Sequence, residues 1–503
     1  MGIRRKEGER CGRLAALAPA GPPGLEDAVS SSRSRWGLLP SLRRWFMAAE
    51  TVEGAGAAGS WQPRRGSGEQ ALLSSVTSRK KWRVALLSLN LPDCYNLANE
   101  YLRGFALEDP ELAQRVAFHI LNVPRPQNKY LLLARIFALR PHVVGFSCYV
   151  WNIRRTLEVA RLVKRALPWT RVILGGQEVT LRRAEFLERY PFVDVVVNGE
   201  GEETFTDLLK HWIRDPRGSL AGVPGILYRE NGGVAVTAER PLIGDLDRIP
   251  SPYLADRIPI RKGYRLGMML EVYRGCRFRC AFCFEGKKYR QLRSFSLDRL
   301  EREVNHLFAR GARLFHIMDP ILGNQEPKNL TILHRIFTRL QEQEPCEISV
   351  EVFGDLLHEK NIHYFEPFTI FDVGLQSTNP IVLKNIRRNY HQEKFLQGLA
   401  LLKKLNRQVN LYLIMGLPGE TVESYLEGIK FAVGVDPSYL FLNRLCVLSG
   451  TELRERAEEY GLQYDPEPPY FIEATPDMTP DDIRRLESFS TALSAEHNLK
   501  IGR

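Results

Sequence analysis

Three cysteines, Cys276, Cys280 and Cys283, stand within eight residues of a chain that holds only 8 cysteines in 503 residues. A structural zinc site needs four ligands in a tetrahedral array, usually as two Cys-x-x-Cys pairs, yet the next cysteines, 346 and 446, stand alone. Three thiolates can instead bind three irons of a 4Fe–4S cluster and leave the fourth iron open to another ligand. The spacing therefore favours a cluster-binding loop over a zinc site.

The elements that must position these cysteines form a regular series. The cysteines directly follow an expected strand, GMMLEVYRG. Five further expected strands follow, with helical stretches such as SLDRLEREVNHLFARG separating several of them: RLFHIMDP, EISVEVFGD, FTIFDVGLQS, QVNLYLIMGLP and SYLFLNRLCVL. Six such units predict a (β/α)6 partial TIM barrel over residues 266–455, in which functional residues lie at the C-terminal strand ends. The cysteines occupy that position.

A second α/β domain is expected before the barrel, over residues 82–215. WRVALLSLN, HVVGFSCYV, RVILGGQEV and FVDVVVNGE are apolar on both faces, and NIRRTLEVARLVKRALP repeats its apolar residues at helical spacing. Continuous apolar strands alternating with amphipathic helices are typical of a parallel sheet covered on both sides, here a Rossmann-like fold. A proline-containing linker is expected at 216–265, and a helical extension at 456–503.

Charge and cysteine usage exclude several classes of protein. The formal net charge is +11, but residues 1–81 hold 14 Lys and Arg against 7 acidic residues, so most of the excess lies there. That segment lacks an apolar period and is expected to be a disordered basic segment, with Met47 as a possible shorter start. The remainder carries no nucleic-acid signature, no membrane span and no disulfide framework. A cytoplasmic protein is expected.

The cysteine loop resembles the signature of the radical S-adenosylmethionine (SAM) enzymes, with Phe282 as the aromatic residue before the last cysteine. The resemblance implies that SAM chelates the open iron and is cleaved to a 5′-deoxyadenosyl radical, with electrons from a donor such as flavodoxin or ferredoxin. It also implies SAM-binding positions at the later strand ends, although the family's usual Gly-Gly-Glu is absent. These are Asp319 in HIMDP, Glu351 in SVEVFGD, Gln376 in VGLQSTN, Arg388 in NIRR and Leu417 in MGLPGET. For each, the alternative is an ordinary strand-end residue.

The N-terminal domain resembles those of cobalamin (B12)-binding-domain-containing radical SAM proteins. VVGFSCYVWN, VILGGQEV, VVNGEGEETF and DLDRIPSPY occur in the family's order. The resemblance implies cobalamin-binding positions at Ser147, Tyr149, Gly175, Gly176 and Glu200. The alternative is a generic doubly wound domain whose glycines let chain and helix approach. The C-terminal stretch PPYFIEATPDMTPDDIRRLESFSTAL resembles a domain of unknown function found in a bacterial branch of these proteins.

One departure concerns the cobalt ligand. Cobalamin domains that place a protein imidazole on the cobalt carry Asp-x-His-x-x-Gly after the first strand, whereas this chain has Asp93, Cys94, Tyr95 and Asn96 there. Histidines occur in the domain only at 119, 142 and 211. The sequence therefore predicts cobalamin with its nucleotide base displaced and no histidine on the cobalt. A degenerate domain that has lost cobalamin is the competing interpretation.

The combined resemblance implies a cobalamin-dependent radical SAM enzyme with three cofactors: a 4Fe–4S cluster, SAM and cobalamin. The expected reaction is methyl transfer to an unactivated carbon or phosphorus of a small-molecule substrate. One alternative is a non-methylating rearrangement or cyclisation on the same cofactors. Another, of a different class, is a non-catalytic cobalamin or iron–sulfur sensor. No residue pattern identifies the substrate, since one scaffold of this kind supports many reactions.

Overall fold

The computed structural model describes residues 81–90, 95–124, 128–181, 184–260, 267–285, 291–319, 322 and 325–499. Residues from Lys80 onward form one compact unit. The expectation for residues 1–81 falls almost entirely outside the described residues, as do Asp93 and Cys94. Within the described residues, no helix combines the length and the apolar character that crossing a membrane requires.

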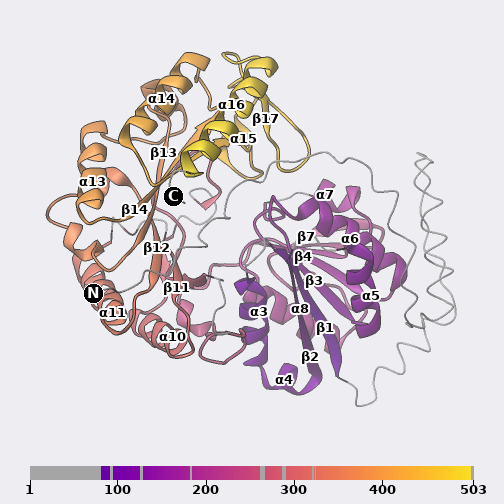
Figure 1. The fold of residues 1–503 in the computed structure, drawn as a ribbon. Coiled ribbons are helices and arrows are strands. Elements are labelled where there is room, and N and C mark those ends of the chain that lie inside the picture. The colour runs from indigo at the N-terminus through magenta and orange to yellow at the C-terminus, as the bar shows by residue number, and fades with distance from the viewer. Residues whose placement is uncertain are drawn as a thin grey trace, which may run out of the picture. The chain divides into compact units, whose positions relative to one another are not determined.

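The first domain is built on a seven-stranded sheet, seen in Figure 1 in indigo and purple. Its strands are β1 (Trp82–Asn90), β2 (Val116–Pro124), β3 (Val143–Ser147), β4 (Arg171–Gly175), β5 (Val195–Val197), β6 (Ile226–Glu230) and β7 (Gly233–Val236). They lie in the order β2-β1-β3-β4-β5-β6-β7, and the first five are parallel. The order reverses between β1 and β3, so the strand ends on either side of that point diverge and leave room for a ligand.

Helices cover both faces of this sheet. They are α3 (Leu97–Leu107), α4 (Pro110–Arg115), α5 (Lys129–Leu139), α6 (Ile153–Ala166), α7 (Ala184–Arg189) and α8 (Glu202–Arg214). Figure 1 shows α5 and α6 on one side, with α3 and α8 on the other. Strands β3 and β5 are buried along their whole length, as expected for a parallel sheet covered on both faces. The predicted Rossmann-like domain is confirmed.

Two strands, β6 and β7, lie inside the stretch that was expected to be a linker, residues 216–265. These strands pair antiparallel with each other, and β6 pairs antiparallel with β5, so the first sheet continues to Val236. The hairpin turn is Asn231-Gly232, both with positive φ, at +49° and +83°. Such an Asn-Gly pair suits the turn that matches the twist of two antiparallel strands. The Asn-Gly pair is visible in the sequence and lies inside the stretch that was expected to be a linker.

The barrel sheet consists of β8 (Met268–Glu271), β11 (Leu314–Met318), β12 (Glu347–Val352), β13 (Ile370–Gln376), β14 (Gln408–Met415) and β15 (Tyr439–Arg444). All six are parallel and pair in chain order. The helices between them are α10 (Leu297–Ala309), α11 (Pro327–Gln343), α12 (Pro380–Asn385), α13 (Gln392–Lys404) and α14 (Val422–Val435). The predicted (β/α)6 partial barrel is confirmed.

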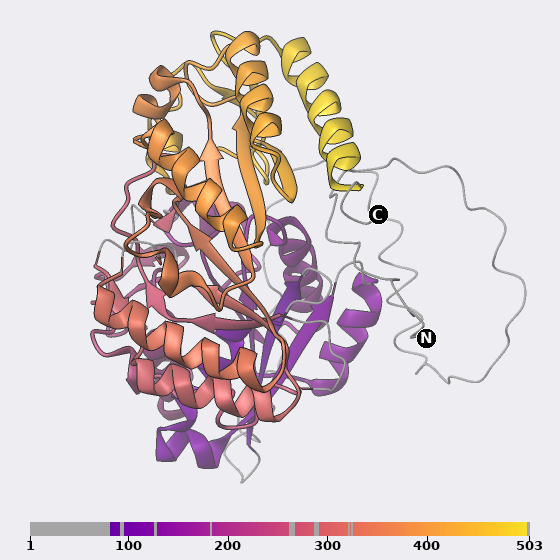
Figure 2. The same cartoon turned by 60° about the vertical axis from the view of Figure 1, so that its left-hand side comes forward.

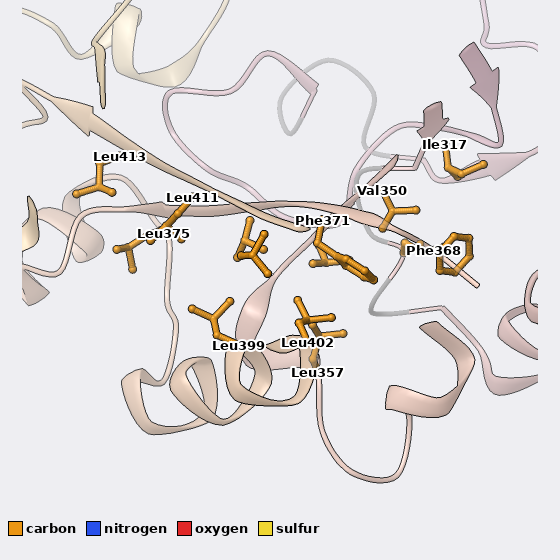
Figure 3. Close-up of a cluster of buried hydrophobic side chains, with 14 of the residues drawn as sticks. Ile317, Val350, Leu357, Phe368, Phe371, Leu375, Leu399, Leu402, Leu411 and Leu413 are labelled. Carbon is orange, nitrogen blue, oxygen red and sulfur yellow. The ribbon is translucent and has the colours of Figure 1, made fainter. Parts of the chain in front are cut away.

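The barrel core lies between these strands and the helices outside them. In Figure 3, Leu399 and Leu402 of α13 point toward the sheet that carries Phe371 and Leu411, and all four are buried. Because side chains alternate along a strand, the neighbours of these core residues face the opposite side of the sheet. The polar residues Asp372 and Asn410 are such neighbours, and that side is the barrel interior.

The C-terminal region differs in detail from the expected helical extension at 456–503. Its elements are α15 (Glu452–Glu455), β16 (Gln463–Tyr464), β17 (Ile472–Ala474) and α16 (Pro480–Leu499). A short antiparallel strand pair therefore precedes the helix. Figure 2 shows α16 in yellow beside the last helices of the barrel, where the hydroxyls of Tyr425 and Ser490 lie 3.0 Å apart. The helix covers the edge strand β15, to which Asn498 bonds at Leu440.

Candidate active site

One cavity of about 640 Å³ is lined by the C-terminal strand ends of both domains. From the first domain it is lined by Ser147, Tyr149, Gly175, Gly176, Gly199 and Glu200, among others. From the barrel it is lined by Glu271, Arg274, His316, Asp319, Glu351 and Asp372, among others. Parallel strands place their carboxyl ends and following loops at one edge of a sheet. Two such edges facing one cavity bring residues distant in sequence to a common site.

The cysteine loop, residues 275–285, begins at the mouth of the barrel. It is preceded by β9 (Tyr273–Arg274), which pairs with β10 (Arg293–Ser294). Cys276, Cys280 and Cys283 form no disulfide bond and are partly buried. Burial raises the pKa of the Cys276 thiol to about 11, and charge on the other two thiols adds to the effect. The three sulfurs are therefore close enough to interact electrostatically.

The cysteine loop lies apart from the other described cysteines. Within the described residues, no three His, Cys, Asp or Glu side chains are close enough to hold one metal ion together. The ligands of a 4Fe–4S cluster bind different irons and so lie farther apart than the four ligands of one zinc ion. The other described cysteines lie elsewhere: Cys148 is buried after β3, Cys346 is buried before β12, and Cys446 follows β15.

Arg388 lies directly beside the cysteine loop. Its Nη1 donates a hydrogen bond to Cys280 Sγ at 3.8 Å, and Nη2 donates to the carbonyl of Gly374. The guanidinium stacks 4.2 Å from the ring centroid of Phe353, which in turn stacks on Phe278 of the loop. Arg388 is thus held by the ends of β12 and β13 against the first half of the loop.

Two other predicted positions lie close to this arginine or to the loop. Gln376 has a positive φ of +69° at a bulge where β13 shifts register against β14. A side chain at Gly374 would collide with the Gln376 amide and Arg388, so the glycine permits their approach. Phe282 packs against the barrel core. Neither Gln376 nor Phe282 lines the cavity.

Asp319 and Glu351 line the cavity at the ends of β11 and β12. Asp319 is buried and accepts a hydrogen bond from Gln325 Nε2 at 3.0 Å. Burial raises the pKa of the Glu351 carboxyl, and the nearby charge of Asp372 raises it further. Leu417, in contrast, is fully buried in the barrel core and does not line the cavity. Of the five predicted SAM-binding positions, these two reach the cavity.

A polar cluster around Asp372 was missed by the sequence reasoning. Asp372 Oδ1 accepts hydrogen bonds from Asn410 Nδ2 and the Tyr412 hydroxyl, both at 2.8 Å, and Oδ2 accepts from the Ser349 hydroxyl at 3.1 Å. His316 lines the cavity nearby, and burial lowers its pKa, an effect that Asp372 partly offsets. The signal for the cluster was present as polar residues at alternate positions inside apolar strands.

The predicted cobalamin-binding positions of the first domain come together at the cavity. Ser147 is buried, and its hydroxyl donates to Asn99 Oδ1 at 2.9 Å. Gly176 has a φ of +105°, and a Cβ there would lie 2.6 Å from the carbonyl oxygen of Cys148. Tyr149 stacks on Trp151 with ring centroids 4.6 Å apart. Gly175 and Gly176 present only backbone to the cavity, and bare backbone can be approached closely by a large ligand such as the nucleotide part of cobalamin.

Glu200 has a different environment from the other predicted positions. It accepts hydrogen bonds from Arg274 at 3.1 Å, from Arg293 at 2.9 Å and from the backbone N–H of Ile243 at 2.9 Å. These partners belong to β9, β10 and the segment after β7. Its carboxylate oxygens are therefore engaged by protein donors, and Glu200 connects the first domain to the barrel.

The histidines of the first domain lie away from the cavity. His142 stacks on Trp82 at 5.0 Å and accepts a hydrogen bond from the backbone of Arg83, and burial lowers its pKa to about 4. His119 is in β2 and His211 is in α8. None of the three lines the cavity. In the described part of the loop after β1, Tyr95 donates to Glu100 and Asn96 caps α3.

Comparison with known proteins identifies both domains that line this cavity. Residues 270–432 match the family model of the radical SAM superfamily, and residues 111–209 match that of the B12 binding domain. The chain is 29% identical to the cobalamin-dependent radical SAM methyltransferase TokK of Streptomyces tokunonensis over 82% of its length. It is 31% identical to 2-(S-pantetheinyl)-carbapenam-3-carboxylate methyltransferase of Streptantibioticus cattleyicolor over 70%. The alignments span 62% and 53% of those two relatives.

Solved structures show the same fold. The radical SAM methyltransferase TsrM from Kitasatospora setae, with cobalamin and a 4Fe–4S cluster bound, has a TM-score of 0.63 at 19% identity, covering 77% of this chain and 78% of TsrM. The cobalamin-dependent radical enzyme OxsB, with aqua-cobalamin and SAM bound, has a TM-score of 0.64 at 17% identity, covering 85% and 69%. The chain therefore carries a region that matches the B12 binding domain, followed by a region that matches the radical SAM superfamily.

Proposed function

We propose that this chain is a cobalamin-dependent radical SAM methyltransferase acting on an unactivated carbon or phosphorus of a small molecule. One observation carries the proposal: a single cavity is lined by residues that flank the three cysteines and by the strand ends of the B12-binding domain. Arg274 and Glu285 represent the first set, and Ser147 and Gly176 the second. Methyl transfer between two cofactors requires that both face one space, from which bulk water is largely excluded.

The more similar relatives support methyl transfer, whereas three others, 24–26% identical, are named anaerobic magnesium-protoporphyrin IX monomethyl ester cyclase. Two of the most similar curated relatives are named as methyltransferases. A further relative, 28% identical over 63% of this chain, is named an uncharacterized methyltransferase of Pyrococcus horikoshii. Because the fold alone does not define a reaction, the transfer to this chain rests on the combination of these names with the shared cavity.

The cofactors and the residues proposed to hold them follow from the site. When bound, the cluster with SAM supplies hydrogen-atom abstraction, and cobalamin supplies a transferable methyl group. Cys276, Cys280 and Cys283 hold three irons of the cluster. Arg388 places a positive charge beside the Cys280 sulfur, which stabilises the negative charge of thiolate ligands.

The cavity walls provide the remaining contacts. Asp319 and Glu351 at the ends of β11 and β12 bind the polar groups of SAM. Ser147 and Gly176 receive the cobalamin tail. The polar cluster around Asp372 lies at the cavity wall and binds the substrate. A flavodoxin or ferredoxin supplies electrons to the cluster in the cytoplasm.

The test follows a labelled methyl group. The full-length protein is purified without oxygen, reconstituted with iron, sulfide and hydroxocobalamin, and incubated with trideuteromethyl-SAM, a reductant and a small-molecule extract. Mass spectrometry then follows labelled products, methionine and 5′-deoxyadenosine. The Cys280→Ala variant is the matched control, because it retains the B12-binding domain but loses a cluster ligand.

Three results distinguish the alternatives. A labelled product formed by the wild-type protein and absent from the Cys280→Ala reaction supports the proposal. Release of methionine and 5′-deoxyadenosine with no labelled product contradicts methyl transfer and favours a rearrangement or cyclisation. A loaded cluster with no turnover of SAM at all contradicts an enzyme and favours a sensor.

A further inference from the structure

The cysteine loop contacts the first domain through a residue just before its first cysteine. Arg274 lies two residues before Cys276 and forms ion pairs with Glu200 at 3.1 Å and Glu202 at 2.8 Å, both from the segment after β5. A third ion pair, to Glu271 at 3.1 Å, fixes the guanidinium against β8. The side chains of Arg274, Glu200 and Glu202 are 13%, 9% and 7% exposed. Buried ion pairs of this kind hold their geometry because separating them leaves an unpaired charge away from water.

A second contact with the first domain lies just after the last cysteine. Glu285 is two residues after Cys283 and accepts a hydrogen bond from Gln177 Nε2 at 2.8 Å. Gln177 directly follows Gly176 at the end of β4. The loop that carries all three cysteines is therefore held at both flanks by residues of the first domain.

The first-domain residues that make these two contacts belong to the same loops that line the cavity. The loop after β4 contributes Gly176 and Gln177, and the loop after β5 contributes Gly199, Glu200 and Glu202. A ligand that contacts these two loops restricts their movement, and the restriction passes directly to Arg274 and Glu285. Coupling between two binding sites is reciprocal. A cluster that orders the cysteine loop must therefore raise the affinity for the ligand by the same factor by which the ligand raises the affinity for the cluster.

We propose that Arg274 and Glu285 are positioning residues that couple the cysteine loop to the loops after β4 and β5, so that cluster assembly and cobalamin binding strengthen one another. The proposal rests on the proposed function in one respect, that the first domain binds cobalamin. In this proposal, the contacts between the two domains fix the distance between the two cofactors.

The coupling is measured as an affinity ratio on the full-length protein. Hydroxocobalamin is titrated by equilibrium dialysis without oxygen into the protein lacking the cluster and into the protein with the cluster reconstituted. In the wild-type protein, the Kd should fall about fivefold or more when the cluster is present, the lower end of typical coupling between sites. In Arg274→Gln the two Kd values should differ by less than about twofold, because the ion pairs that carry the coupling are lost.

Arg240→Gln provides a matched control. The Arg240 side chain is 14% exposed and forms ion pairs with Glu203 and Asp207, so it resembles Arg274 in burial and pairing. All its side-chain hydrogen bonds within the described residues go to α8 of the first domain. The affinity ratio of Arg240→Gln should therefore equal that of the wild-type protein.

The second contact, between Gln177 and Glu285, can be removed by substitutions that disturb the fold less. Gln177 is exposed, so Gln177→Ala should fold normally while reducing the affinity ratio. Glu285→Ala should reduce it equally, whereas Glu285→Gln retains an acceptor oxygen for Gln177 and should preserve the ratio. Glu285→Met keeps a side chain of similar size without the acceptor oxygen, so it should reduce the ratio as Glu285→Ala does, a result that mere filling of space would not give.

The possible failures are distinguishable. Equal Kd values with and without cluster in the wild-type protein, or an undiminished ratio in both Arg274→Gln and Gln177→Ala, overturn the coupling and leave the proposed function intact. No cobalamin binding in either state overturns both proposals. A cluster-dependent ratio lost in Arg274→Gln, in a protein that transfers no methyl group, supports the coupling and contradicts the proposed function alone.

Discussion

Arg388 Nη1 donates a hydrogen bond to the sulfur of Cys280 at 3.8 Å, although the two residues are 108 positions apart in the chain. Arg388 is only 6% exposed, so its charge is poorly screened by solvent. A buried positive charge beside a thiolate favours the electron-rich, reduced form of a bound cluster. The family resemblance implies that this arginine binds SAM, and the structure adds its contact with Cys280.

Replacing Arg388 should make the cluster harder to reduce. Arg388→Gln removes the charge, and the midpoint potential of the reconstituted cluster should become more negative by on the order of 50 mV, equivalent to nearly tenfold in a one-electron equilibrium. Potentiometric titration followed by electron paramagnetic resonance measures the change. Arg387→Gln is the control, because Arg387 is half-exposed and pairs with Glu452 instead. Equal potentials in both variants would contradict an electrostatic role for Arg388.

The three cysteines should hold the cluster jointly. Alanine at Cys276, Cys280 or Cys283 removes one of three protein ligands, so each variant should lose most of its iron and the absorption near 400 nm that thiolate–iron clusters give, an approximate band position. Iron analysis after anaerobic reconstitution measures this loss. Cys346→Ala should retain the wild-type iron content, because Cys346 is buried beside β12. Roughly four irons per chain in the triple alanine variant would sink the assignment.

Glu420 should make the stability of the protein depend on pH. Burial raises its pKa from 4.5 to about 8, against the hydrogen bonds that it accepts from Ser377 and the backbone of Gly416. Between these values the folded protein keeps a proton that the unfolded chain releases, so the free energy of unfolding falls as pH rises. The slope of this contribution is at most about 1.4 kcal/mol per pH unit.

The variant Glu420→Gln isolates that contribution. Its amide oxygen can accept from Gly416 while the Ser377 hydroxyl accepts from its amide N–H, so the local hydrogen bonds are retained. Denaturant unfolding from pH 5 to pH 8 should show the wild-type protein losing stability relative to Glu420→Gln. A constant difference between the two proteins over this range would show that Glu420 does not titrate there.

Bound cobalamin should carry no histidine on its cobalt. Of the described histidines, His316 alone lines the cavity, and it projects from the barrel strand β11 rather than from the first domain. The electron paramagnetic resonance spectrum of the cob(II)alamin complex should therefore lack nitrogen superhyperfine splitting. A clear nitrogen triplet would refute this, and its loss in His316→Gln would identify the ligand.

Gly176 should tolerate no side chain. Its φ of +105° and the 2.6 Å approach of a Cβ to the carbonyl oxygen of Cys148 make Gly176→Ala strained. The free energy of unfolding should fall by roughly 1–3 kcal/mol. Gly222→Ala is the control, since nothing lies within 4 Å of a Cβ there. Equal stability of the two variants in urea would contradict the steric argument.

The sequence by itself determined the two domains, their order and the cysteine loop. These features are local: apolar strands alternate with amphipathic helices, and three cysteines follow one strand at fixed spacing. The Asn231-Gly232 hairpin is equally local, because an Asn-Gly pair by itself favours a tight turn between two strands. Strand-end positions such as Glu351 could also be predicted from the sequence, because parallel strands direct their C-terminal ends to one edge of the sheet.

Tertiary structure alone decided which of those positions share a cavity and what each one contacts. Leu417 and Glu351 are both strand-end residues in the sequence, yet Leu417 is buried in the core and Glu351 lines the cavity. Glu200 forms ion pairs with Arg274, 74 positions away, and Asp372 accepts from residues on β12 and β14. Such contacts depend on how two sheets and their loops pack. That packing is set by many distant side chains together, so no local pattern records it.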